Sequence, residues 1–175
     1  MEADWEIEAG GGAPVIEALW PGFVDLRRNP ERIGEIQEAA EFPALAGLLQ
    51  SLNGSGAPVW TAKCDLWEPE PNELACYVDL LPVADTVFAQ WEDAEAFCRE
   101  WVARLAPVAQ PDCRVDLVVR QAIAGEAEGF GVTAYVNAAG RDRSGAAEAL
   151  GAALVAFAGA IPRAADSATA ASKLQ

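Results

Sequence analysis

The stretch WTAKCDLWEPEPNELACYVDL, residues 60–80, decides the fold because apolar and polar side chains alternate on both sides of a Pro-rich turn. Successive side chains of a strand point to opposite faces, so the alternation predicts a hairpin of two half-buried strands. The predicted apolar face carries Trp60, Ala62, Cys64, Leu66, Leu74, Cys76, Val78 and Leu80. The predicted polar face carries Thr61, Lys63, Asp65, Trp67, Tyr77 and Asp79.

A second alternating stretch follows in residues 113–137, with a loop predicted at residues 125–129. Its apolar positions are Val115, Leu117, Val119, Phe130, Val132, Ala134 and Val136. Its polar positions are Arg114, Asp116, Arg120, Thr133, Tyr135 and Asn137. The only two tyrosines of the chain, Tyr77 and Tyr135, thus occupy equivalent places in the two strand pairs.

A helix is predicted after each strand pair, so residues 59–107 and 113–162 are predicted to be two strand-strand-helix repeats. The first helix is expected within residues 86–106, capped by Asp85 or Thr86, with Phe88 and Trp91 among its buried residues. The second is expected over residues 144–161, capped by Ser144. The resulting fold class is α+β, an antiparallel sheet with helices packed on one face.

Residues 1–58 are predicted to add strands and a helix to the same domain. Residues 5–8 alternate as an edge strand does, and three glycines at 10–12 predict a flexible loop. A helical turn is predicted at residues 14–19, a strand at 23–26 and a second turn from Pro30. The firmest helix begins at Pro43 and carries leucines at positions 45, 48, 49 and 52.

We therefore predict one globular domain over residues 1–162 and a disordered tail over residues 163–175, which are small, polar and without a pattern. No apolar run approaches the ~20 residues that span a bilayer, and residues 1–8 lack the features of a signal peptide. We expect a cytoplasmic protein that does not bind membranes.

Composition excludes several chemistries. The chain has no histidine, which removes the commonest general base and metal ligand, and its four cysteines form no Cys-x-x-Cys pair. We expect no metal, no cofactor and no His-based catalytic site. With 27 acidic and 12 basic residues, the net charge of −15 repels a phosphate backbone, so nucleic acid is not an expected partner.

The polar sheet face is the predicted place for function. Its candidate ligand-binding residues are Lys63, Asp65, Tyr77, Asp79, Arg114, Asp116, Arg120 and Tyr135. The first hypothesis is a non-catalytic protein-interaction module. The alternative is a small-molecule binding protein, which would need a concavity on this face. A histidine-free enzyme using Asp65 and Asp79 as an acid and a base is the third.

We also predict self-association as a symmetric dimer. The helix over residues 144–161 carries a single charged residue, Glu148, and offers more apolar surface than one sheet face covers. Light scattering at micromolar concentration is expected to give twice the mass of the chain. A monomer mass would contradict the prediction.

Overall fold

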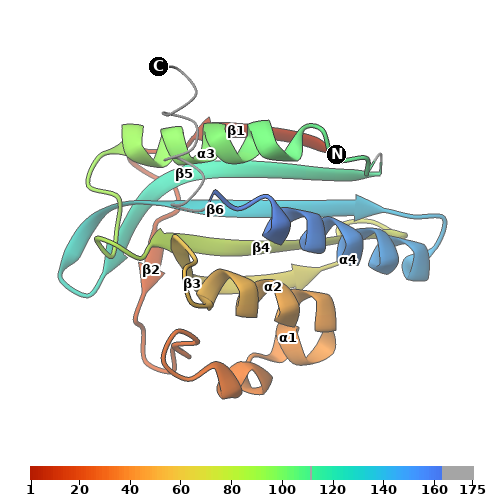
Figure 1. The fold of residues 1–175 in the computed structure, drawn as a ribbon, viewed down its shortest axis with the longest axis horizontal. Coiled ribbons are helices and arrows are strands. Elements are labelled where there is room, and N and C mark those ends of the chain that lie inside the picture. Colours follow the sequence, from red (N-terminus) through yellow and green to blue (C-terminus); the bar gives the residue numbers. More distant parts are fainter. Residues whose placement is uncertain (111, 163–175) are drawn as a thin grey trace.

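The two predicted hairpins lie side by side in one sheet in the computed structural model, which describes residues 1–110 and 112–162 (Figure 1). The first hairpin is β3 (Val59–Trp67) with β4 (Glu73–Pro82), and the second is β5 (Cys113–Ala124) with β6 (Ala127–Ala139). β4 pairs antiparallel with β6, which gives the order β1-β5-β6-β4-β3. β5 ends at Ala124 and β6 begins at Ala127, so the loop between them is shorter than the predicted loop over residues 125–129.

The N-terminal strands make the sheet mixed. β1 (Glu2–Ile7) and β2 (Ile16–Ala18) both pair parallel with β5, one after the other along its length. The predicted edge strand is confirmed, but the predicted purely antiparallel sheet is wrong. The helical turn predicted at residues 14–19 is also wrong, since this segment contains β2. Residues 23–26 do not form the predicted strand and instead lead into a turn at Asp25.

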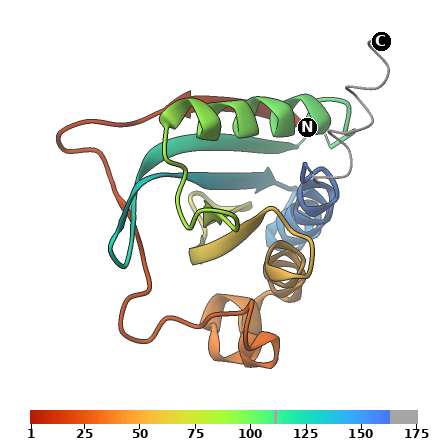
Figure 2. The same ribbon diagram turned by 60° about the vertical axis from the view of Figure 1, so that its left-hand side comes forward.

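The helices gather on one side of the sheet (Figures 1 and 2). α3 (Trp91–Leu105) packs on β1, β5 and β6, and α4 (Arg143–Gly159) packs on β6 and β4. α2 (Pro43–Asn53) lies beside α4 and over β3, while η1 (Pro30–Glu35) and α1 (Gln37–Glu41) precede it. Among the described residues, no helix is long and apolar enough to cross a bilayer.

The main core lies between this helical layer and the sheet. All four predicted leucines of α2 are buried, and the rings of Trp101 and Phe157 stack at 4.2 Å between α3 and α4. The predicted start of α3 is wrong by several residues. Phe88 lies before the helix and bridges to Phe130, and Trp91 is 39% exposed rather than buried.

A bulge reverses the faces at the start of β3. The register shifts between Thr61 and Lys63, so that Thr61 hydrogen-bonds Asn53 of α2 on the helical side while Trp60 lies on the opposite side. One extra residue in a strand has this effect because side chains alternate with a period of two. The predicted faces of Trp60, Thr61 and Ala62 are therefore wrong, whereas those from Lys63 onward are right.

The displaced residues build a second, smaller core on the side of the sheet away from the helices. Trp60 and Ala62 pack there with Ile16 of β2 and Leu81 of β4. The indole of Trp60 donates to the carbonyl of Pro82 at 3.1 Å, and the Arg27 guanidinium lies 3.9 Å from its ring centroid. This small core covers one end of the face that was predicted to be polar throughout.

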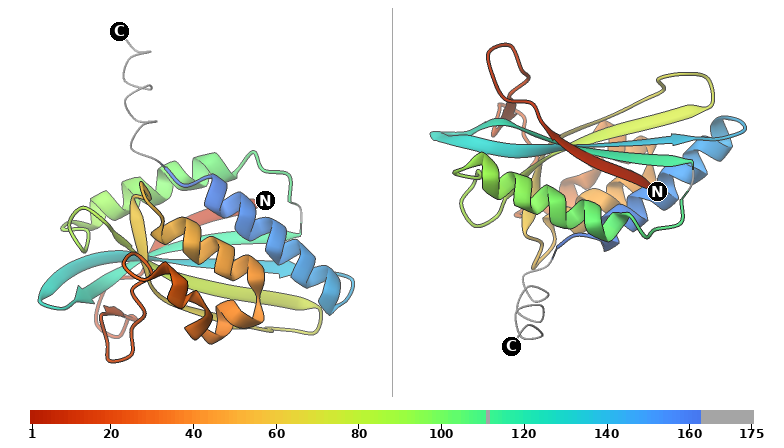
Figure 3. Two further views of the ribbon diagram at one scale, coloured as in Figure 1. Left: turned by 60° about the horizontal axis from the view of Figure 1, so that its bottom comes forward. Right: turned by 90° about the horizontal axis from the view of Figure 1, so that it is seen from above.

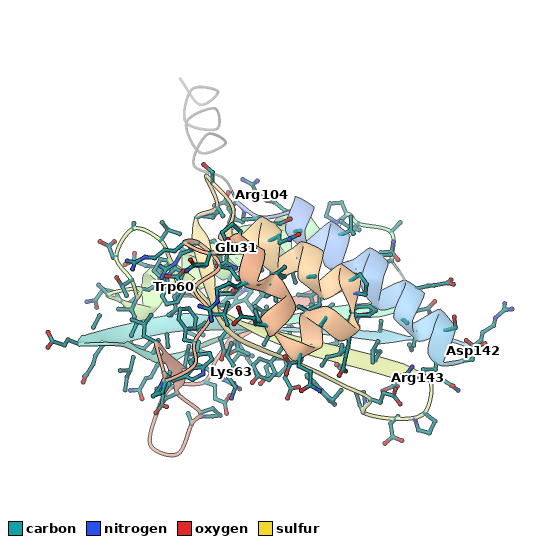
Figure 4. The ribbon with its side chains drawn as sticks, turned by 90° about the horizontal axis from the view of Figure 1, so that it is seen from below. Glu31, Trp60, Lys63, Arg104, Asp142 and Arg143 are labelled. Carbon is teal, nitrogen blue, oxygen red and sulfur yellow. The ribbon has the colours of Figure 1, made fainter. Side chains whose placement is uncertain are left out.

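The N-terminus of α4 is capped by Asp142 and not by Ser144. Asp142 lies at the start of α4 (Figure 4), and its side chain accepts a hydrogen bond from the backbone N–H of Gly145 at 2.8 Å. Ser144 is the second residue of the helix. Asp142 is the better cap because a carboxylate satisfies a free N–H and also faces the positive end of the helix dipole. The tail predicted for residues 163–175 lies outside the described residues.

We expect Asp142→Ala to lower the free energy of unfolding by about 1 kcal/mol, the usual cost of a lost N-cap. Ser144→Ala is the matched control and is expected to leave it nearly unchanged, since Ser144 lies within α4. Urea unfolding at neutral pH measures both. An equal loss in the two variants would contradict the assignment of the cap.

Candidate functional site

The cross-strand register brings the predicted polar residues together in rows on the face away from the helices. In one row Lys63 pairs with Asp79, which pairs in turn with Thr133. In the next row the order across the sheet is Asp65, Tyr77, Tyr135 and Asp116. Arg114 and Arg120 lie on β5 at positions that alternate onto the same face. All eight candidate residues thus share one surface.

Three aromatic rings form a cluster in the middle of this surface. The centroids of Tyr77 and Tyr135 are 6.0 Å apart, and Trp67 lies 6.2 and 6.5 Å from them. Such tilted and edge-on contacts are favourable between aromatic rings. The cluster accounts for Trp67, whose place on a polar face the sequence left without a partner.

β1 and the residue that follows it supply carboxylates that hold both arginines of the surface. Arg114 contacts Asp116 and Glu2 at 2.6 Å each, and Arg120 contacts Glu8 at the same distance. Arg120 also donates to the Tyr135 hydroxyl at 3.1 Å. Glu2 and Glu8 were not among the predicted site residues, because only the parallel pairing of β1 with β5 brings them there.

A cavity of about 490 Å³ opens over the row that contains Asp79. Its sheet side is formed by Lys63, Tyr77, Asp79, Arg120, Thr133 and Tyr135. Its other wall is formed by residues 14–17 and Trp20, from the segment that leaves β1 and rises on the side opposite the helices (Figure 3). Gly131 makes room for this wall, because a Cβ there would lie 2.9 Å from Cδ1 of Ile16.

Asp79 is the most unusual residue of the cavity, since it is an acidic residue that is only 8% exposed. The hydroxyl of Thr133 donates to Oδ1 of Asp79 at 2.6 Å. Burial raises the pKa of Asp79 above its ordinary value, and the Thr133 hydrogen bond, Arg120 and Lys63 only partly offset this effect. Burial, aided by Asp79, likewise raises the pKa of Tyr77, so its phenol stays protonated at neutral pH.

A second hollow of about 400 Å³ adjoins the first. Arg120 and Tyr135 line both hollows, so their hydrogen bond lies at the boundary. Asp4 and Glu6 of β1 form part of the second hollow, together with Arg114 and Asp116. Asp65 lines neither hollow, so the predicted pairing of Asp65 with Asp79 as an acid and a base does not arise in a common cavity.

The cysteines lie away from this chemistry. All four are free, and burial raises the pKa of Cys64, Cys76 and Cys98 to about 12. Protonated thiols in apolar surroundings behave as small hydrophobic side chains. Over residues 1–110 and 112–162, no group of three or more Cys, Asp or Glu side chains is arranged to hold a metal ion.

No family model, curated protein or solved structure matches the chain. A fold alone does not specify a function, so the function has to be inferred from the geometry and charge of this surface.

We expect Asp79→Asn to raise the melting temperature at pH 7 by a few degrees. The folded-state pKa of Asp79 is raised above that of the unfolded chain, so its ionisation costs stability as the pH rises. An amide avoids this cost and keeps an oxygen to accept the Thr133 hydroxyl. The gain is expected to shrink as the pH is lowered to 4, because the folded protein takes up the proton more readily than the unfolded chain. 

Thermal unfolding followed by circular dichroism at both pH values measures this difference. Asp65→Asn is the matched control, because it removes the same charge from an exposed position on the neighbouring strand. A gain at pH 7 that is equal in the two variants would show a general charge effect and contradict the role of burial.

Proposed function

We propose that the protein is a non-catalytic binding module that holds a small polar molecule in the cavity over Asp79. The main support for this proposal is a cavity of about 490 Å³ with Asp79 at its bottom, where this buried residue accepts a hydrogen bond from the hydroxyl of buried Thr133. Ligand sites in proteins fall in the same range of roughly 300–1,000 Å³ and use a few fixed polar groups to orient the ligand.

The polar groups of the cavity are held before any ligand arrives. Thr133 fixes one oxygen of Asp79, and Glu8 together with Tyr135 fixes Arg120. These residues lie on paired strands rather than on loops, so little conformational entropy is lost when they contact a ligand. This preorganisation favours the small-molecule reading over the protein-interaction module that the sequence placed first, since a protein partner would leave the cavity unused.

A catalytic role has less support. The cavity brings together one buried carboxylate, two phenols and a hydroxyl, but Asp65 lies outside it and the chain has no histidine. Glu17, Lys63 and the two tyrosines also line the cavity, but the hydrogen bond to Asp79 comes from Thr133, whose hydroxyl does not serve as an acid or a base near neutral pH.

The predicted homodimer stays a proposal, supported by Val155 of α4, which is 71% exposed. α2 and the sheet cover other sides of α4, so the contact would centre on its outer surface. The predicted repeat also stays a proposal. The direct pairing of Tyr77 with Tyr135 at the centre of the sheet supports two units related by a local twofold axis.

To test the binding function, we expect at least one compound from a panel of small polar cations, zwitterions, anions and neutral polyols to raise the melting temperature of the protein. Val15→Trp is expected to abolish this shift, because Val15 is 41% exposed and lines the cavity. Val83→Trp is the matched control, since Val83 is 51% exposed and lies outside the cavity.

Differential scanning fluorimetry measures the shift, and isothermal titration calorimetry confirms a single site. Retention of the shift in Val15→Trp would contradict binding in this cavity. A panel in which no compound shifts the wild-type protein would contradict the proposed function itself.

A further inference from the structure

We infer that the cavity binds the ammonium group of an organic amine, with the carboxylate of Asp79 as its counter-charge. This inference rests on the proposed function and adds the chemical class of the ligand. It stands on three features of the molecule: the charge at the bottom of the cavity, the aromatic rings around it and the charge of the whole surface.

Asp79 supplies the charge at the bottom. Asp79 is buried, with only 8% of the residue exposed to solvent. Thr133 donates one hydrogen bond to Oδ1, and no described residue forms an ion pair with the carboxylate. An ionised carboxylate accepts up to about four hydrogen bonds, and a primary ammonium group donates three. An ammonium group placed in the cavity therefore matches the remaining acceptor capacity and offsets the cost of burying the charge.

The aromatic rings suit the same ligand. Tyr77, Tyr135 and Trp20 all line the cavity, with Trp20 in the wall opposite the sheet. The face of an aromatic ring attracts a cation within about 6 Å of its centroid, with a gain of about 0.5–2 kcal/mol. Because burial raises the pKa of Tyr77, its ring is a neutral phenol at pH 7 and offers both a ring face and a hydroxyl.

The surface around the cavity repels anions. Its carboxylates are Glu2, Asp4, Glu6, Glu8, Glu17, Asp65, Asp79 and Asp116, and its bases are Lys63, Arg114 and Arg120. Both arginines are already paired at 2.6 Å, Arg114 with Glu2 and Arg120 with Glu8, and the Arg120 side chain is only 12% exposed. The chain as a whole carries a net charge of −15. An acidic field of this kind raises the local concentration of cations and lowers that of anions.

A change at Lys63 distinguishes binding of an amine from binding of a ligand that carries a carboxylate. Lys63 lies on β3 directly across from Asp79 in the register, is exposed and lines the cavity. The ammonium group of Lys63 repels the ammonium group of a bound amine. The same group attracts the carboxylate of a ligand that carries one. Removing the charge of Lys63 therefore changes the affinity in opposite directions for the two classes.

The test uses four-carbon probes that differ only in their end groups: 1,4-diaminobutane, butylamine, 4-aminobutanoate and succinate. Isothermal titration calorimetry at pH 7 and 150 mM salt is expected to rank both amines above 4-aminobutanoate and to detect no binding of succinate. Asp79→Asn is expected to weaken amine binding at least tenfold. Lys63→Met is expected to strengthen it by about two- to fivefold, since a nearby like charge is removed.

Asp85→Asn is the matched control, because it removes the same charge from an exposed turn outside the cavity. An equal loss in Asp79→Asn and Asp85→Asn would show attraction to the acidic surface as a whole and overturn the inference. Tighter binding of 4-aminobutanoate or succinate, weakened by Lys63→Met, would also overturn it while leaving a small-molecule site in place. If none of the four probes binds, the ligand class is wrong, and the outcome of the wider panel with Val15→Trp decides the proposed function separately.

Discussion

The pairing of β4 with β6 is the constraint on which the rest of the structure depends, because it joins the two hairpins and places Tyr77 directly opposite Tyr135. In this register Val78 and Val136 point into the helical layer, and Asp79 points to the other side. A slip of one residue would turn one strand over relative to the other and place Tyr77 and Tyr135 on opposite sides of the sheet. The aromatic cluster, the cavity floor and the main core therefore all follow from one strand pairing.

The face assignment could be predicted from sequence wherever a strand alternates without interruption. It holds for the segment from Lys63 onward and for the second hairpin, where Val115 and Val119 face the helices. It fails at Trp60 and Thr61 because the bulge depends on contacts with Asn53 and Ile16, which lie outside the strand. β2 could not be predicted since its three residues gain their structure only by pairing with β5, more than a hundred residues away.

The residues of the candidate site could likewise be predicted only in part. The residues that the sheet contributes could be predicted, because polar side chains recur at every second position of the strands. The wall made by residues 14–17 and Trp20 could not be predicted, because β2 and the loop before it show no such alternation. The burial of Asp79 at the bottom of the cavity was not predicted either, because the polar alternation of β4 placed it on an open face. Glu2 and Glu8 did carry a signal, namely acids at every second position of residues 2–8, which fits a strand with one charged face.

The same acids give β1 a further property, since β1 forms an outer edge of the sheet. An edge strand leaves backbone N–H and C=O groups free to pair with a strand of another molecule, which is the first step of cross-β aggregation. Two β1 strands from different molecules would bring Glu2, Asp4 and Glu6 against one another as like charges. Electrostatic repulsion between these like charges therefore opposes pairing of this edge with a second copy of itself.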